Sequence, residues 1–241
     1  LDDEQIVLWC AGSSDHRGSW VDPRGDLEAN VVGLIRMLQR FSGRLVFVSS
    51  GAVYHGLTGL VGPDIHLAPG FPYGISKLTA ERYVHAFADA GLLDEFVVLR
   101  LFHPYGPGEP SRRIMARLVH RFGIERARDI RLFGDGDTLM DVLPIAEVAE
   151  AIVRAAVAST NGTTFDICAG NPPTLRSLAR SVAEAFGIDA NIEGDPSAAE
   201  EAIEFFADPE PGRVALGLRP PRPLGAVVQE YAAWLRTNAD A

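Results

Sequence analysis

The sequence predicts an α/β fold in which a doubly wound parallel sheet is joined to a smaller, mixed C-terminal lobe. Short continuous apolar runs alternate with segments whose apolar residues recur at helical spacing. This alternation is typical of parallel strands joined by right-handed helical crossovers. The chain has 241 residues and 47% hydrophobic content, so it is long enough to bury a core of this size.

The first part of the chain supplies the strands and helices of the predicted sheet. A continuous apolar run such as IVLWCA is expected of a strand that helices cover on both faces. Pro72 begins the longest predicted helix and Gly91 follows its end, which are the positions that these residues favour. In order, we predict a strand at 6–11, a polar loop at 12–25, a helix at 26–41, a strand at 45–48, a helix at 72–90 and a strand at 96–102.

The pattern changes after the turn-rich string PYGPGEP at residues 104–110. Strands become short and helices follow one another, which favours a mixed lobe over a continuation of the sheet. A GDGD turn is predicted at residues 134–137. The elements expected here are helices at 112–122, 145–158, 175–186 and 224–235, and strands at 130–133 and 164–168.

Charge and composition exclude several classes of function. The net charge of −10 without a basic run argues against nucleic acid as a partner, and no apolar run approaches the length that crosses a membrane. Cys10 and Cys168 form neither a CxxC pair nor a disulfide framework, which suits a reducing cytosol, so we expect a cytoplasmic protein. Asp135, Asp137 and Asp141 lack the spacing of a calcium loop, so we predict a hairpin turn there and no metal site.

One tyrosine and one lysine have the spacing of an acid/base couple. Lys77 is the only lysine among 22 basic residues, and it follows Tyr73 by four positions in a predicted helix. Residues four apart share a helix face, so the ammonium would lie near the phenol and lower its pKa by favouring the phenolate. Such a phenol can exchange a proton with a hydroxyl or ketone whose carbon gives or takes a hydride. The pair therefore favours oxidoreductase chemistry.

A serine follows the second predicted strand, upstream of this helix. Ser50 lies at the carboxyl end of the strand, where open parallel sheets bind ligands. Its hydroxyl could hydrogen-bond a reacting oxygen and orient it toward Tyr73. A serine in this place is otherwise a turn residue or a helix cap, and the residues alone leave both interpretations open.

Several strings occur together in an order that is typical of one family. They are VFVSSGAVY, PYGISKLTAERY, VVLRLFHPYGPGEP, LFGDGDTLMDVLPIAEVAEAI, and FFADPEPGRVALGLRP with EYAAWL. From Val7 onward the chain resembles the extended short-chain dehydrogenase/reductases, and among them the NAD-dependent epimerase/dehydratase family, typified by UDP-glucose 4-epimerase. The resemblance implies a Rossmann-type sheet, a nicotinamide cofactor, either NAD or NADP, and a nucleotide-sugar substrate.

The resemblance also implies roles for individual residues. Ser50 would orient the substrate, Tyr73 would be the acid/base, and Lys77 would hold the cofactor ribose and tune Tyr73. The expected cofactor contacts are Cys10, Ala11, Gly12, Asn30, Ser49, Tyr73, Lys77 and Phe102, and the expected substrate contacts are Ser50, Gly51, Ala52, His103 and Arg112. Residues 1–105 and about 139–168 would bind NAD(P), and residues 106–138 and 169–241 would form the substrate-binding lobe.

The glycine-rich turn of the family is missing at the start of this sequence. Family members begin with a strand and a GxxGxxG turn that binds the pyrophosphate, so we expect that a natural N-terminal segment is absent from this sequence. A similar string at Gly56, Gly59 and Gly62 lacks the strand–turn–helix setting. We interpret it as a flexible loop beside the active site.

Substrate-side positions also depart from the family's pattern. Met140 stands where an arginine commonly clamps the nucleotide diphosphate, and residues 198–204 (AAEEAIE) are acidic where a second arginine is usual. His103 stands where the epimerases usually have asparagine, and it would be either a substrate contact or a hydrogen-bonded structural histidine. The arginines that could substitute are Arg112, Arg113 and Arg213.

The sequence therefore predicts an NAD(P)-dependent sugar-nucleotide epimerase or 4-ketoreductase, with the epimerase favoured. A 4,6-dehydratase is disfavoured, because that branch carries a Thr-Asp-Glu triplet where this chain has Ser50, Gly51 and Ala52. Two alternatives remain: the same chemistry on a hydroxyl or ketone substrate without a nucleotide, and a non-catalytic dinucleotide-binding sensor or a fragment that needs its missing half. By resemblance we expect a homodimer through the helices at 26–41 and 72–90.

Overall fold

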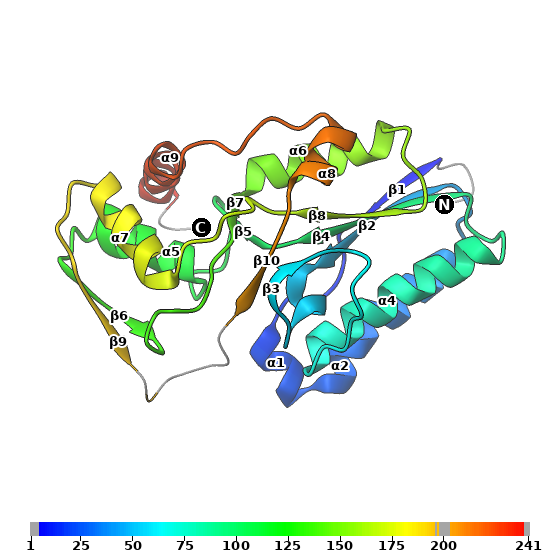
Figure 1. Ribbon diagram of the computed structural model, residues 1–241, viewed down its shortest axis with the longest axis horizontal. Helices are drawn as coiled ribbons and strands as arrows, with labels where there is room; N and C mark the ends of the chain where they lie inside the picture. Colours follow the sequence, from blue (N-terminus) through cyan, green and yellow to red (C-terminus); the bar gives the residue numbers. More distant parts are fainter. Residues whose placement is uncertain (1–4, 196, 198–202, 239–241) are drawn as a thin grey trace. The chain divides into compact units, whose positions relative to one another are not determined.

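The computed structural model describes residues 5–195, 197 and 203–238, and they form two compact units (Figure 1). Unit 1 comprises Leu1–Phe102, Ala149–Cys168 and Ala207–Arg219, and unit 2 comprises His103–Val148, Ala169–Phe206 and Pro220–Ala241. In the described part of the chain, no helix has both the length and the apolar character that crossing a membrane requires. The acidic stretch predicted at 198–204 lies mostly outside the described residues.

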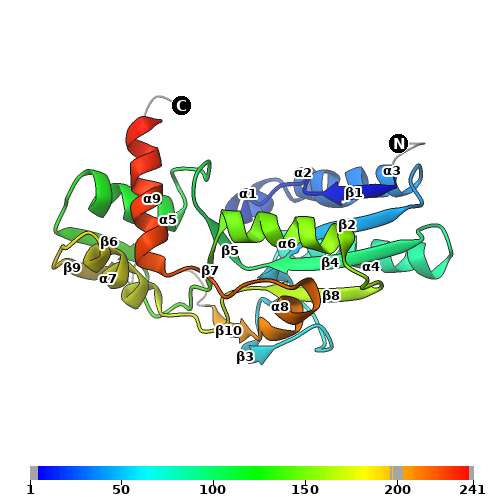
Figure 2. The ribbon, with the colours of Figure 1, turned by 90° about the horizontal axis from the view of Figure 1, so that it is seen from above.

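Unit 1 is built on a parallel sheet with the strand order β1-β2-β4-β8. Helices α2, α3 and α4 cover one face of the sheet, and α6 and α8 cover the other, as Figures 1 and 2 show. The elements are β1 (Ile6–Trp9), α1 (His16–Val21), α2 (Pro23–Leu27), η1 (Glu28–Val32), α3 (Gly33–Leu38), β2 (Arg44–Ser50), η2 (Gly51–Tyr54), β3 (Thr58–Val61), α4 (Pro72–Asp89), β4 (Glu95–Leu101), β8 (Thr163–Ile167) and α8 (Glu210–Leu216), with α6 (Ile145–Val157) shared by both units. This sheet confirms the α/β prediction.

The register of the strands brings their carboxyl ends to one edge of the sheet. Ser50 at the end of β2 pairs with Leu101 at the end of β4, and Leu101 pairs with Ile167 at the end of β8. On the α4 side, the apolar core of the unit includes Leu45, Phe47 and Val98 from the strands. Loops that follow β1, β2 and β4 therefore start from a common, rigid edge.

Unit 2 is a helical layer with two small parallel sheets, β5-β7 and β6-β9. Thr174 caps α7, because its hydroxyl accepts the Ser177 N–H at 3.2 Å. The core is almost entirely apolar and is centred on Phe122, Leu178 and Tyr231. The elements are β5 (His103–Tyr105), α5 (Ile114–Leu118), η3 (Val119–Ile124), β6 (Asp129–Phe133), β7 (Val142–Pro144), α7 (Leu175–Ala185), β9 (Asn191–Asp195) and α9 (Leu224–Thr237), and β10 (Glu204–Ala207) has its last residue in unit 1.

Four expectations about single elements were wrong. Strand β1 is not covered on both faces, since Ile6 and Leu8 are 41% and 43% exposed. The predicted loop at 12–25 contains helix α1 and the start of α2, which Asp15 and Asp22 cap through their side chains. Strand β3 occupies residues 58–61 inside the glycine string. The turn at 134–137 does not close a hairpin, because β6 pairs in parallel with β9.

The unit boundaries also differ from the expected portions at three places. Residues 103–105, which form β5, belong to unit 2. Residues 139–148 belong to unit 2, since β7 pairs with β5. Residues Ala207–Arg219 belong to unit 1, because α8 packs on β8. The close approach depends on Gly212, where a Cβ atom would lie 3.3 Å from the Asp166 carbonyl oxygen.

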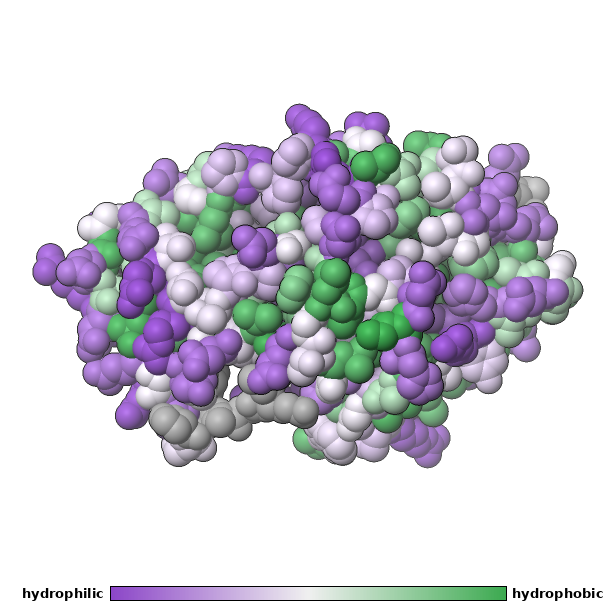
Figure 3. All heavy atoms as spheres, viewed as in Figure 1, coloured by the Kyte–Doolittle hydropathy of each residue, from purple (hydrophilic) through white to green (hydrophobic). Residues whose placement is uncertain are grey.

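On the face drawn in Figure 3, hydrophobic side chains are interspersed among hydrophilic ones. Among the described residues, exposed hydrophobic side chains occur on several different elements of unit 1. They include Trp20 and Val21 on α1, Leu60 on β3, Val153 and Val157 on α6, and Val214 on α8.

Candidate active site

Tyr73 and Lys77 occupy the first two turns of α4, which begins at Pro72. Both side chains are buried, each with 5% of its surface exposed. Gly74 lets the start of this helix approach the segment after β2, because a Cβ atom there would lie 2.8 Å from the Ala52 carbonyl oxygen. The local sequence thus brings the tyrosine–lysine pair close to residues 50–52.

The ammonium of Lys77 lies against strand β2. Its Nζ donates a hydrogen bond to the Val48 carbonyl oxygen at 2.7 Å and lies 4.7 Å from the centroid of the Phe47 ring. Burial lowers the pKa of Lys77 to about 8, while the negative charges of Glu81 and Asp26 oppose that shift. Two N–H donors of the ammonium remain for a ligand hydroxyl.

Ser50 ends β2 and is half-buried. Its Oγ accepts a hydrogen bond from the Ala52 N–H at 3.1 Å and so caps η2, which is the capping role considered for it. The same hydroxyl keeps its proton to donate to a ligand. Ser49 points the other way, because its Oγ donates to Glu81 at 2.5 Å, and only its main chain is left for a cofactor.

An aromatic cluster surrounds the ring of Tyr73. The imidazole of His16 stacks on it with 4.7 Å between ring centroids and an angle of 28°, and Phe71 lies at 6.1 Å. His16 begins α1, which the sequence pattern predicted as a loop, so this contact was missed. The Asp15 cap just before it is the signal that could have revealed the helix.

The loop after β1 forms part of the same edge. Cys10, Ala11 and Gly12 are exposed there, and Gly12 has a φ of +140° that favours glycine. A Cβ atom at Gly12 would lie 2.4 Å from Oδ1 of Asn30, so the loop runs directly over this amide. An exposed backbone turn of this kind leaves room for a flat ligand at the carboxyl end of the sheet.

Asn30 is fully buried and uses its whole amide within unit 1. Its Oδ1 accepts the Ser13 N–H at 3.0 Å, and its Nδ2 donates to Asp26 at 2.9 Å and to Ser76 at 3.2 Å. The predicted cofactor contact at Asn30 would therefore be indirect, through the loop that it holds. Phe102 is buried under the site, where its ring would lie 3.3 Å from a Cβ atom at Gly51.

A buried polar network lies beneath the site, and the sequence analysis did not find it. Arg100 on β4 binds Glu81 on α4 through two hydrogen bonds of 3.0 and 2.7 Å, and it donates to the Tyr54 hydroxyl at 2.6 Å. Tyr54 in turn donates to the Asp166 carboxylate at 2.9 and 3.0 Å. Burial raises the pKa of Asp166 to about 6. The network ties α4 to three strands of the sheet.

Two of the expected substrate contacts, His103 and Arg112, belong to unit 2. The main-chain N–H of His103 donates to the Asp141 carbonyl oxygen at 2.9 Å, and Arg112 is exposed on a turn before α5. The Asp141 carboxylate accepts the N–H groups of Ala169 and Gly170, which anchors the chain after β8. Asp141 therefore has a structural role in this loop.

Two of the positions considered for an arginine clamp do not supply a free cation. Met140 is buried in the core of unit 2 with 7% exposed. Arg213 is on α8 and binds Glu210 through two hydrogen bonds of 2.8 and 2.6 Å.

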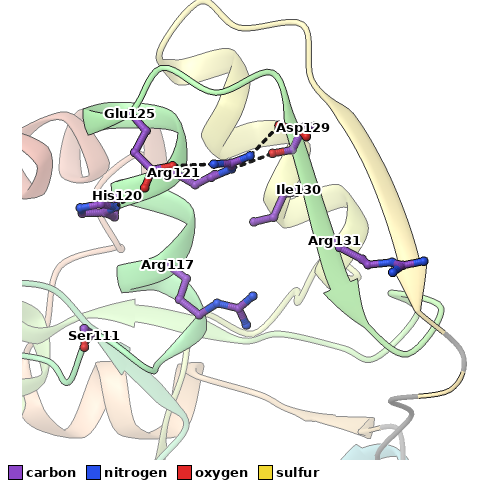
Figure 4. Close-up of a pocket in the computed structure, with 8 residues that line it drawn as sticks. All are labelled: Ser111, Arg117, His120, Arg121, Glu125, Asp129, Ile130 and Arg131. Carbon is purple, nitrogen blue, oxygen red and sulfur yellow. Dashed lines mark hydrogen bonds and ion pairs between the residues drawn. The ribbon is translucent and has the colours of Figure 1, made fainter.

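A pocket of about 470 Å³ in unit 2 is rich in arginine (Figure 4). Figure 4 shows Arg117 from α5 pointing into the space beside β6, and Arg121 bridging Glu125 and Asp129. The lining contains three arginines and the carboxylates of Glu125 and Asp129, and Arg131 also lies 3.8 Å from the Asp195 carboxylate. Guanidinium groups are the side chains that bind phosphate and other anions. Its residues are Ser111, Arg117, His120, Arg121, Glu125, Asp129, Ile130 and Arg131.

Comparison with known proteins decides the family. The family model described as NAD dependent epimerase/dehydratase family matches residues 2–168. The chain belongs to the NAD-dependent epimerase/dehydratase family. The resemblance stated from its motifs is thereby confirmed, and so is the NAD cofactor class of the family.

Relatives of two kinds are similar to this family member. It is 27% identical to the GDP-6-deoxy-D-mannose reductase of Pseudomonas aeruginosa over 206 residues, which covers 79% of this chain and 66% of that protein. It is 24% identical to the UDP-glucose 4-epimerase of Mycolicibacterium smegmatis over 242 residues, which covers 98% of this chain and 77% of that protein. The chain thus spans about two thirds to three quarters of these relatives.

A solved structure shares the fold. MoeE5 in complex with UDP-glucose and NAD superimposes with a TM-score of 0.87 at 26% identity, covering 100% of this chain and 82% of that one. This likeness confirms the Rossmann-type fold predicted for the chain.

Proposed function

We propose that this family member is an NAD(P)-dependent sugar-nucleotide epimerase or 4-ketoreductase, and that Tyr73, Lys77 and Ser50 perform the chemistry. The observation that carries the proposal is the buried pair of Tyr73 and Lys77 on α4, beside Ser50 at the carboxyl edge of a parallel sheet. Ligands of open α/β sheets bind at this edge. Tyr73 and the only lysine of the chain are four residues apart on α4, a spacing at which the ammonium would favour the phenolate of the tyrosine.

The residues at this edge fit the nicotinamide end of the cofactor. Lys77 has N–H donors for the ribose hydroxyls, and the exposed turn at Cys10, Ala11 and Gly12 has room beside it. When bound, NAD accepts a hydride from a carbon of the substrate and can return it. We assign the cofactor to unit 1 and the substrate's distal part to unit 2.

The chain's own residues move the proton. The Ser50 hydroxyl donates a hydrogen bond to the reacting oxygen and orients it. The Tyr73 phenolate takes the proton of that substrate hydroxyl as the C–O bond becomes a carbonyl, and the phenol gives the proton back when the carbonyl is reduced. Lys77 keeps its ammonium near the phenol, so the phenolate costs less free energy to form.

The arginine-rich pocket in unit 2 supports a substrate that carries a diphosphate. Arg117 and Arg131 line it, and guanidinium groups bind phosphate oxygens through two parallel hydrogen bonds. The printed names of the matched relatives, a GDP-6-deoxy-D-mannose reductase and a UDP-glucose 4-epimerase, favour a nucleotide sugar over the alternative substrate without a nucleotide. The acid/base pair favours an enzyme over the non-catalytic sensor.

We favour epimerisation over reduction, in agreement with the prediction made from the sequence motifs. The matched relatives include both an epimerase and a reductase, and their similarity to this chain is below 30%. Cofactor content separates the two reactions. An epimerase returns the hydride in each cycle and retains stoichiometric NAD after purification. A reductase binds NADPH and releases NADP in each cycle, so it is purified without a bound cofactor.

The decisive variant is Tyr73→Phe, compared with Tyr83→Phe on the exposed part of the same helix. With NAD and UDP-glucose supplied, we expect Tyr73→Phe to lower turnover by about 10²- to 10⁴-fold, because it removes the proton transfer. Tyr83→Phe should leave turnover unchanged. An inactive wild type with every nucleotide sugar tested, or full turnover in Tyr73→Phe, would contradict the proposal.

The homodimer and the cytoplasmic location stay predictions. Three exposed hydrophobic side chains on the helices named for the dimer support the former: Leu27 on α2, and Ile75 and Tyr83 on α4 are 44%, 49% and 39% exposed. Burying such side chains against a second copy would remove apolar surface from water.

A further inference from the structure

We propose that Asp26 is a positioning residue for the reaction, because its carboxylate is the counter-charge that holds the buried Lys77 ammonium in its charged form. The inference rests on the proposed function, since it deepens the role of Lys77 there. Asp26 lies near the end of α2, next to α4, and neither the motifs nor the family resemblance assigns it a role.

The side chain of Asp26 is buried without a cation in contact. It is 5% exposed, its Oδ1 accepts the Asn30 amide N–H at 2.9 Å, and its Oδ2 has no hydrogen-bond partner among the described residues. A buried carboxylate oxygen without a partner costs free energy, so it requires an explanation. No lysine or arginine nitrogen of the described chain lies within 4 Å of this carboxylate. Its negative charge therefore acts on the Lys77 ammonium through space and not by direct contact.

Besides the Tyr73 phenol on its own helix, three titratable groups face Lys77 from the elements around it. Glu81 lies one turn further along α4, Asp26 comes from α2, and Cys10 follows β1. Strand β2 contributes only the neutral Val48 carbonyl and the Phe47 ring. Glu81 and Asp26 are the two carboxylates whose negative charge offsets the burial of Lys77.

Asp26 differs from the other two groups in that its charge is not shared with a cation. The Glu81 carboxylate already accepts two hydrogen bonds from Arg100, and the ion pair is nearly neutral as a whole. Cys10 is exposed at its surface, but the partial loss of water around its thiol raises the pKa above the usual value near 9, so the thiol is neutral in the range where Lys77 titrates. Asp26 is the charge that no described cation balances.

A short relay of hydrogen bonds fixes Asp26 relative to the lysine. Asn30 donates both to Asp26 and to the Ser76 hydroxyl, and Ser76 directly precedes Lys77 on α4. Ser76 in turn donates to the Tyr73 carbonyl oxygen at 3.0 Å. The carboxylate is therefore held in place against the turn of α4 that carries both members of the acid/base pair.

The single lysine makes the experiment direct. Protein labelled with ¹⁵N-lysine has one Nζ resonance, so its chemical shift against pH reports the pKa of Lys77 without any cofactor. For the wild type we expect a midpoint near 8. In Asp26→Asn, which keeps the shape and the acceptor for Asn30, we expect the midpoint to fall by about one unit or more.

Glu28→Gln is the matched control. Glu28 lies two residues away, has a 56% exposed side chain and pairs with Arg24 at 3.0 Å, so its removal should leave the midpoint unchanged. An unchanged midpoint in Asp26→Asn, or an equal fall in Glu28→Gln, would overturn the inference. Asp26→Ser replaces Asp26→Asn if the latter does not fold, as circular dichroism would show.

Turnover gives a second readout that a purely structural role would not move. As pH falls below the lowered midpoint, the ammonium of Asp26→Asn is protonated again, so the ratio of variant to wild-type turnover should rise by several-fold between pH 8 and pH 6.5. A ratio independent of pH contradicts the inference. Full turnover in Tyr73→Phe would instead contradict the proposed function and leave the Lys77 midpoints unaffected, so the two failures are distinguishable.

Discussion

Nine of the ten buried polar or charged side chains in the described residues belong to unit 1, whereas unit 2 buries only Asp141. In unit 2 the charged groups pair near the surface, as Arg121 and Glu125 do with 40% of each side chain exposed. Charges interact strongly and shift their pKa values where water is excluded, and weakly where it is not. The difference teaches that unit 1 holds most of its buried polar groups away from water, whereas the Arg121–Glu125 pair of unit 2 stays in contact with it.

The largest expected effect comes from breaking the buried ion pair of unit 1. Arg100→Leu leaves Glu81 charged and unpaired in a site where only 5% and 3% of the two side chains are exposed. We expect the free energy of unfolding to fall by about 3–5 kcal/mol, measured by urea denaturation. Arg121→Leu in unit 2 is the control and should have no measurable effect, because that pair is open to solvent. Equal losses in both variants would remove the distinction between the units.

A second prediction concerns the pH dependence of stability. The folded-state pKa of Asp166 is raised to about 6 from 3.8, so the folded state binds more protons between these pH values. Its contribution to stability is thus present below about pH 4 and lost as pH rises through 6. Between pH 4 and 7 the unfolding free energy of the wild type should fall by roughly 2 kcal/mol relative to Asp166→Asn. A difference independent of pH would show that Asp166 titrates normally.

The smallest effect is expected at the surface of unit 2. Glu125→Gln removes one carboxylate from the arginine-rich pocket and should leave the unfolding midpoint unchanged. The affinity for inorganic pyrophosphate, measured by calorimetry at low salt, should rise by less than about fivefold. Weaker binding in this variant would show that the pocket is not an anion site.

The main elements of the sheet and the tyrosine–lysine pair were predictable from the sequence because they rest on local patterns. A buried parallel strand such as β2 is a continuous apolar run, and four-residue spacing on α4 is visible in the letters. Short elements were missed for the same reason. Helix α1 depends on a single Asp15 cap, and β3 is only four residues long.

Contacts between distant segments could not be predicted from local patterns. The bonds from Tyr54 to Asp166 and from Arg44 to the Ala155 carbonyl oxygen join residues more than 100 positions apart. The buried Asp26 is one of many acidic residues in the sequence, and only its place beside α4 distinguishes it. The exposed face of β1 was missed because an apolar run indicates that a strand favours burial on both faces. It does not show whether neighbouring elements are present to cover those faces.

The close approach at Gly74 has a consequence for anyone who scans this enzyme by random mutagenesis. A side chain there would collide with the Ala52 carbonyl oxygen, the Pro69 ring and the Phe71 ring, all within 2.9 Å of the new Cβ atom. Position 74 will therefore tolerate almost no replacement and will resemble a catalytic position in the resulting map. Its intolerance reports the spacing between a helix and a loop, and a search for a missing acid or base at that position would find none.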